Sequence, residues 1–179
     1  MPNHCRNSLC VVDRIGRVVP SSKMDMRTLL ETNIGFSNIE DGRPIIHFHG
    51  IIPMPEFDAG NKNSVTSGLF RMPDWYEWRV ENWGTKWDAY EGEWLVDHHM
   101  FSTAWSPPLQ VIYALAVRTQ QILHLQYKEE GMGLLGEYWV NGRTKTEKTK
   151  EYDISDSKSL PPHILYTFGE LYDYLDAGT

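Results

Sequence analysis

The 179-residue sequence predicts an α+β fold: a βαβ unit, an insertion, a βαββ unit and a C-terminal helical extension. Short β-branched segments alternate with amphipathic ones, which is typical of strands and helices that share one core. Two Pro-Pro pairs, at 107–108 and 161–162, mark the starts of predicted helices. No segment approaches the ~20 apolar residues that a membrane-spanning helix needs. A hydrophobic content of 41% is ordinary for one globular domain.

The first half of the chain predicts a strand, a helix and a second strand. Cys5 to Val12 is rich in β-compatible residues and predicts the first strand. Lys23 to Thr32 has an apolar side and predicts a short helix. Ile45 to Ile52 is β-branched and partly alternating, so we expect the second strand there. Pro53 and Pro55 end this strand, because proline cannot donate to a strand ladder.

An insertion is expected over about 53–83. Glu56 to Met72 is rich in Gly, Asn and Ser and predicts a loop. Asp74 begins a short helix that Gly84 ends. Beyond it, the segments 87–90 and 94–103 flank a Glu-Gly-Glu turn and predict a hairpin.

The second half continues with a buried helix and another hairpin. Ser106 is the expected N-cap, and Pro107 suits the first helical position, where its missing N–H is not needed. This helix is predicted to reach about Leu123. The segments 123–127 and 134–140 then predict a hairpin. Two βαβ units with right-handed crossovers in one antiparallel sheet give a ferredoxin-like sandwich over residues 1–143.

The C-terminal part differs in composition. Residues 144–159 hold balanced charges and almost nothing apolar, which predicts a solvated linker. Residues 160–179 predict a short amphipathic helix that either docks on the parent domain or binds a partner. Its apolar positions are spaced i, i+3, i+4 and i+7, at Phe168, Leu171, Tyr172 and Leu175.

Five blocks of sequence together resemble one family. Residues 1–9 are similar to its opening MPNWCxNxL, 48–56 to FxxIIPMPE, and 78–90 to its central motif WRVENWGTKWDAY; 101–108 and 127–133 are similar to its later blocks. The chain is identified by these blocks, over residues 1–142, as a member of the YubB-like ferredoxin-like domain family of phages and plasmids. The resemblance implies the ferredoxin-like fold. It does not imply any particular activity. His4 replaces the family's tryptophan, and 144–179 lies outside the family pattern.

Some residues of the shared motifs are expected to be structural. We expect the tryptophans among them to join the insertion helix to the core hairpin. The set comprises Trp83, Gly84, Thr85, Lys86, Trp87, Thr103, Trp105, Ser106 and Pro107.

Few residues point to chemistry. His47 and His49 form a His-x-His pair, but a closed metal site needs three or four ligands, and no further ligand motif accompanies them. No Gly-x-Ser-x-Gly elbow or phosphate-binding glycine loop is present. We expect no catalysis, metal or cofactor. Cys5 and Cys10 should lie on opposite faces of one strand, unbridged, as in a reducing host cytosol.

Tryptophan and acidic charge are concentrated together. Six of the seven tryptophans lie between Trp75 and Trp105, and from Asp74 to Asp97 seven acidic residues face two basic ones. Tryptophan dominates interface hot spots, and a net charge of −7 disfavours a bare phosphate backbone but suits a basic protein surface. The candidate contact residues are Trp75, Asp88, Glu91, Glu93, Trp94, Phe168, Leu171, Tyr172 and Leu175.

Two functions remain open. The first is an accessory protein of a phage or plasmid that binds and inhibits a host protein without catalysis. The expected target is a defence complex, as for anti-CRISPR or anti-restriction proteins, or a nucleic-acid-processing complex. No membrane is expected to be involved. The alternative is a single-stranded RNA- or DNA-binding module that stacks bases on sheet aromatics. Its candidates are Trp87, Tyr90, Trp94 and Trp139.

Overall fold

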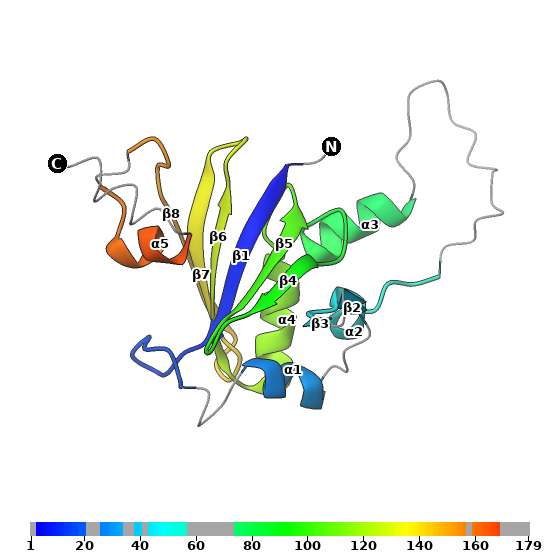
Figure 1. The fold of residues 1–179 in the computed structure, drawn as a ribbon. Coiled ribbons are helices and arrows are strands. Elements are labelled where there is room, and N and C mark those ends of the chain that lie inside the picture. Colours follow the sequence, from blue (N-terminus) through cyan, green and yellow to red (C-terminus); the bar gives the residue numbers. More distant parts are fainter. Residues whose placement is uncertain are drawn as a thin grey trace, which may run out of the picture.

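A computed structural model describes residues 3–20, 26–33, 38–40, 43–56, 74–156 and 159–168, and most of their strands form one antiparallel sheet (Figure 1). The six-stranded sheet has the order β4-β5-β1-β6-β7-β8, and each neighbouring pair is antiparallel. Its strands are β1 (His4–Val11), β4 (Tyr90–Trp94), β5 (His99–Ala104), β6 (Ile122–Glu129), β7 (Leu134–Asn141) and β8 (Thr146–Glu151). A separate pair consists of β2 (Asn38–Glu40) and β3 (Arg43–Ile45).

The order of four strands confirms the expected α+β class. The chain runs from β1 by a long crossover to β4, turns into β5, and returns through one helix to β6. Because β1 lies between β5 and β6, the four strands have the order of a ferredoxin-like sheet, and β7 and β8 extend one edge. The predicted position of the insertion was wrong. It lies inside the first crossover rather than between the halves, since β4 and not 45–52 is the second strand of the unit.

The segment 45–52 folds differently from its sequence pattern. Only Ile45 belongs to a strand, β3, and Phe48–Ile51 forms the short helix α2. Phe48 and Ile51 are buried in the main core, which outweighs their β propensity. Asp88, far along the chain, accepts a hydrogen bond from the first N–H of α2, so a tertiary contact begins this helix.

Among the described residues, four helices cover one face of the six-stranded sheet. They are α1 (Met26–Asn33), α2, α3 (Asp74–Trp83) and α4 (Leu109–Thr119), and in Figure 1 they lie on the opposite side of the sheet from α5 (Pro162–Thr167). The core between them and the sheet includes Leu9, Ile112, Leu115 and Leu125, all fully buried. The free thiols of Cys5 and Cys10 are both buried, as expected for residues that pack rather than bridge.

The predicted start of the buried helix was wrong by two residues. Helix α4 begins at Leu109, and Pro108 rather than Ser106 occupies the capping position. Proline disfavours the helical region for the residue before it, so Pro107 cannot be helical when Pro108 follows. The Ser106 hydroxyl donates instead to the carbonyl of Gly84.

The predicted linker contains a strand. Residues 146–151 pair with β7 as β8, although every one of them is exposed. A strand without apolar residues forms here because β7 offers an unpaired edge. Within the described part of the chain, no helix has the length and apolar character to cross a membrane.

Candidate functional site

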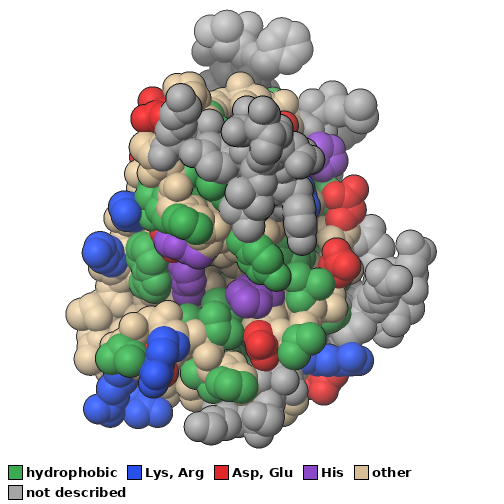
Figure 2. All heavy atoms as spheres, turned by 60° about the vertical axis from the view of Figure 1, so that its left-hand side comes forward, with side chains coloured by type: hydrophobic (Ala, Val, Ile, Leu, Met, Phe, Trp, Pro, Cys, Tyr) green, Lys and Arg blue, Asp and Glu red, His purple; other side chains and the backbone are tan. Residues whose placement is uncertain are grey.

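The sheet face that carries α5, called the α5 face, gathers polar and aromatic side chains. Figure 2 views the molecule from the side of α5 and shows histidines near the middle and lysines and arginines toward the lower edge. Directly paired residues of an antiparallel sheet share a face. The pairs Trp139–Lys148, Glu137–Lys150 and His124–Trp139 therefore place all five side chains on the α5 face.

Strand β8 separates its charges between the two faces. Lys148 and Lys150 alternate with Glu147, Thr149 and Glu151, so lysines lie on the α5 face and glutamates on the helical face. The Lys148 ammonium lies 5.8 Å from the Trp139 ring centroid, and the Lys150 ammonium 4.6 Å from that of Tyr152. The overall net charge of −7 thus conceals a local basic edge.

Trp139 forms the aromatic centre of this face. Its ring stacks on His124 with a centroid distance of 4.7 Å and an interplanar angle of 3°. Trp139 is half-buried, so part of its ring system remains exposed. Next to the pair, a hollow of about 610 Å³ continues toward the strand ends. Its lining includes Ile122 and Asn141 from the same face, and Arg14 and Arg143 from two turns.

A buried carboxylate connects this face to α5. Glu137 is 1% exposed; its carboxylate lies 2.8 Å from His124 Nε2 and 3.1 Å from His163 Nε2, and it accepts a hydrogen bond from the Tyr152 hydroxyl. Burial, the largest single influence, opposes its ionisation, but the bonds from His124, Tyr152 and His163 together outweigh it and lower the pKa of Glu137 to about 2. Glu137 is therefore an ionised structural anchor.

Apolar contacts hold α5 in the same place. Leu160, Ile164, Leu165 and Phe168 form a buried cluster with Leu135 of β7. The Thr167 hydroxyl also donates to Gln126 Oε1 at 2.7 Å. Phe168, predicted as a partner contact, is 6% exposed and packs within the chain, so it is not available to a partner in this arrangement. The other predicted contacts of this helix, Leu171, Tyr172 and Leu175, lie outside the described residues.

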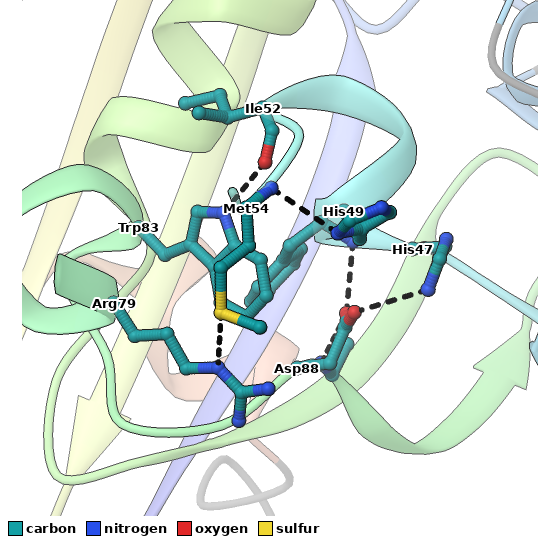
Figure 3. Close-up of polar contacts among 9 residues, drawn as sticks. His47, His49, Ile52, Met54, Arg79, Trp83 and Asp88 are labelled. Atoms are coloured by element: carbon teal, nitrogen blue, oxygen red, sulfur yellow. Dashed lines mark hydrogen bonds and ion pairs between the residues drawn. The ribbon is translucent and has the colours of Figure 1, made fainter. Parts of the chain in front are cut away.

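The histidine pair predicted from the sequence surrounds a helix cap rather than a metal site (Figure 3). Asp88 Oδ1 accepts hydrogen bonds at 2.8 Å from the N–H groups of Phe48 and Ala89, and Asp88 Oδ2 lies 3.4 Å from His47 Nε2. Burial raises the pKa of Asp88, while these N–H groups and His47 lower it. His49 Nδ1 accepts from the Met54 N–H. Among the described residues, no three His, Cys, Asp or Glu side chains could hold a metal ion together.

The other predicted contact residues are dispersed. Trp75 lies on α3, where Arg79 stacks over it, whereas Trp94 stacks on buried His99 with a centroid distance of 4.1 Å. Glu91 accepts from the Ser102 hydroxyl, and Glu93 is exposed on the same strand, β4. These residues do not form one continuous surface with Asp88 and Phe168, since Trp75 and Phe168 belong to helices on opposite faces of the sheet.

The motif residues expected to be structural behave in two ways. Trp83 is 1% exposed and donates to the Ile52 carbonyl at 3.0 Å, and Thr85 is buried and bonded to Ala104. Thr103 donates to the carbonyl of Ser106. Trp105, by contrast, is 40% exposed and has φ 75°, so it does not act as a buried joint. Lys86 stacks over Trp87, Gly84 has φ 79°, and Pro107 is buried.

Sequence reasoning missed most of the α5 face. The sequence indicates Trp139 as a candidate, but no pattern in it indicates His124, Glu137, Tyr152 or His163. The available signal was the period-two alternation of lysine and glutamate in 146–151, which predicts a strand with two different faces. The low apolar content of 146–151 concealed this pattern.

Fold and comparisons agree at the level of the domain class. The chain is an α+β protein with a ferredoxin-like domain, and residues 82–167 match the family model described as the ferredoxin-like domain in Api92-like protein. This match extends through β8 and the whole of α5, beyond residue 142, where the resemblance to the YubB-like family ends. No curated protein and no solved structure matches the chain.

Proposed function

We propose that the chain is a binding module for single-stranded nucleic acid, and that the α5 face is its contact surface. The observation that carries the proposal is the parallel stack of Trp139 on His124 with the Lys148 ammonium over the Trp139 ring. Single-stranded nucleic acid is bound by aromatic rings that stack on bases and basic groups that track the backbone. Both kinds of group occur together on this face.

The surrounding charges support a path for the backbone. Lys150 lies on the same face as Lys148, and Arg14 and Arg143 line the adjacent hollow. A duplex offers no exposed base to Trp139, whereas a single strand does. Because the whole chain carries a charge of −7, the affinity should be moderate. Contacts of the lysines and arginines with phosphates should make the affinity fall with added salt.

Fluorescence anisotropy with labelled single-stranded RNA and DNA oligonucleotides tests the proposal. Trp139→Ala should weaken binding by roughly 5- to 150-fold, the range found when one stacking residue is truncated. Lys148→Ala should reduce the slope of log affinity against log salt by about 0.7 for one lost phosphate contact. Trp75→Ala removes a half-buried tryptophan from the other face and should leave affinity unchanged.

Two results would reject the nucleic-acid proposal. One is the absence of any binding by the folded wild-type chain at low salt. The other is equal loss of affinity in Trp139→Ala and Trp75→Ala, which would separate binding from the α5 face. Circular dichroism of each variant shows whether the fold is retained.

A second candidate is a protein partner, favoured by one exposed apolar turn. Between β4 and β5, Leu95 is 50% exposed and Val96 is 81% exposed, with acidic Glu93 and Asp97 beside them. An apolar tip with acidic flanks suits a basic protein surface. The resemblance of residues 1–142 to the YubB-like family of phages and plasmids supports an accessory role. The target to be inhibited would be a host defence complex or a nucleic-acid-processing complex.

Affinity capture from host lysate tests the second candidate. A stoichiometric partner retained by wild type should be lost with Val96→Asp and kept with Val80→Asp, which changes an apolar residue 41% exposed on α3. Recovery of no partner, or equal recovery by both variants, would contradict it.

A further inference from the structure

A groove on the helical face of the sheet has the form of a ligand site. It lies between α4 and β8, has a volume of about 530 Å³, and its lining includes Leu109, Tyr113, Tyr138 and Glu147. This volume is within the range of roughly 300–1,000 Å³ common for small-ligand pockets. The family match covers both elements that form it.

The charge of the groove is set by the alternation of β8. Glu147 is on the helical face, while the Lys148 ammonium lies over Trp139 on the α5 face. None of the described basic side chains forms an ion pair with Glu147. Lys148 also lines the groove, but its ammonium lies over Trp139, so the Glu147 carboxylate has no ion-pair partner among the described residues.

A buried hydroxyl holds that carboxylate in place. Tyr138 is 2% exposed, and its hydroxyl donates to Glu147 Oε2. Burial and then the Glu147 carboxylate raise the pKa of Tyr138, so the hydroxyl keeps its proton and remains a donor. Half-buried Tyr113 adds an aromatic ring and Leu109 an apolar wall.

We propose that this groove binds the guanidinium of one arginine side chain from a basic protein segment. An oriented carboxylate pairs with the planar fork of a guanidinium, and an aromatic ring attracts the same cation. The apolar wall suits the methylene stem of arginine. A nucleic acid does not fit here, because its phosphates would meet Glu147. The inference does not rest on the nucleic-acid proposal, which concerns the opposite face.

Titration of the full chain with N-acetyl-L-arginine amide, followed by NMR of the tyrosine rings, tests the groove. Saturable shifts are expected at Tyr113 and Tyr138. Glu147→Gln should weaken binding by about 3- to 10-fold. Glu151→Gln is the matched control, because it removes the same charge from the same face of β8 outside the groove and should leave the affinity unchanged.

The citrulline counterpart, which has the same shape without the charge, is the control ligand. Its affinity for the wild-type chain should be no higher than the affinity of the arginine amide for Glu147→Gln. Three results would overturn the proposal: no saturable shift in the wild-type chain, equal binding of the citrulline ligand, or equal weakening by Glu147→Gln and Glu151→Gln. The last would show a general charge effect and no site.

Discussion

Replacing Glu137 with glutamine removes the charge at the centre of the network that anchors α5. The carboxylate is 1% exposed and is bonded to His124 on β6, Tyr152 after β8, and His163 on α5. Glutamine keeps the size of the side chain, but its NH₂ group would face a donor where an oxygen stood before. At least one hydrogen bond of the network is therefore lost together with the charge.

The structure sets the magnitude and the pH dependence. The pKa of Glu137 falls from an ordinary value of 4.5 to about 2 in the folded chain. This difference corresponds to roughly 3 kcal/mol of stability. Because the folded-state pKa lies below the unfolded one, this contribution is fully present above the unfolded value. It disappears as the pH falls through the window from 4.5 to about 2.

Urea unfolding of wild type and Glu137→Gln measures this contribution. Near neutral pH the variant should unfold with a free energy lower by up to roughly 3 kcal/mol. The difference should narrow as the pH falls below 4.5, since wild type then loses the same charge. Glu151→Gln, an exposed carboxylate on the neighbouring strand, should change the free energy by less than about 0.5 kcal/mol. A difference for Glu137→Gln that is small, or that stays constant between neutral and acid pH, would refute the reasoning.

Three further changes test the packing. Asp88→Ala removes the acceptor at the start of α2 and should lower the free energy of unfolding by about 1 kcal/mol, and an unchanged Tm would contradict the capping role. Gly142→Ala would place a Cβ 1.8 Å from the Ala116 carbonyl oxygen, so a loss of about 1–3 kcal/mol is expected in urea unfolding; tolerance would show that the turn can shift. Phe168→Ala should destabilise α5 by up to about 3 kcal/mol and speed hydrogen exchange in it, and unaltered exchange would mean that α5 does not depend on this contact.

The elements predicted correctly are those that depend on local signals. The β-compatible residues of β1 and the turn residues between β6 and β7 identify these strands from the sequence immediately around them. Asp74 and Gly84 mark the start and end of α3 in the sequence and in the structure. Periodicity and turn chemistry act over a few residues, so a single sequence contains them.

The failures share a different cause. Residues 48–51 form a helix because Asp88 binds its first N–H group and because its apolar side chains reach the core. Residues 146–151 form a strand because β7 leaves an edge unpaired. Asp88 is distant in sequence from Phe48, so local propensity cannot indicate the helix. The edge of β7 is close in sequence to 146–151, but this segment has no apolar residue to indicate a strand.

The candidate site shows the same division. Tryptophan density directs attention to the region from Trp75 to Trp105, yet the structure uses Trp83 as core and leaves Trp105 exposed. The α5 face forms only when β6, β7, β8 and α5 come together around Glu137. Its residues are spread from His124 to His163, and none of them carries a motif.

By itself, the sequence determined the α+β class, the hairpin of β6 and β7 and the ferredoxin-like expectation, because hydrophobic periodicity and turn residues encode them locally. The turn predicted at 91–93 was wrong, since these residues lie within β4 and the turn to β5 is at 95–98. Tertiary structure alone decided which strand follows the first crossover, which tryptophans are buried, and where the lysines of β8 lie. The first two outcomes depend on long-range contacts, and the third depends on register, which assigns each side chain of β8 to one face or the other. The alternating charges of 146–151 acquired their meaning only when β7 became their partner.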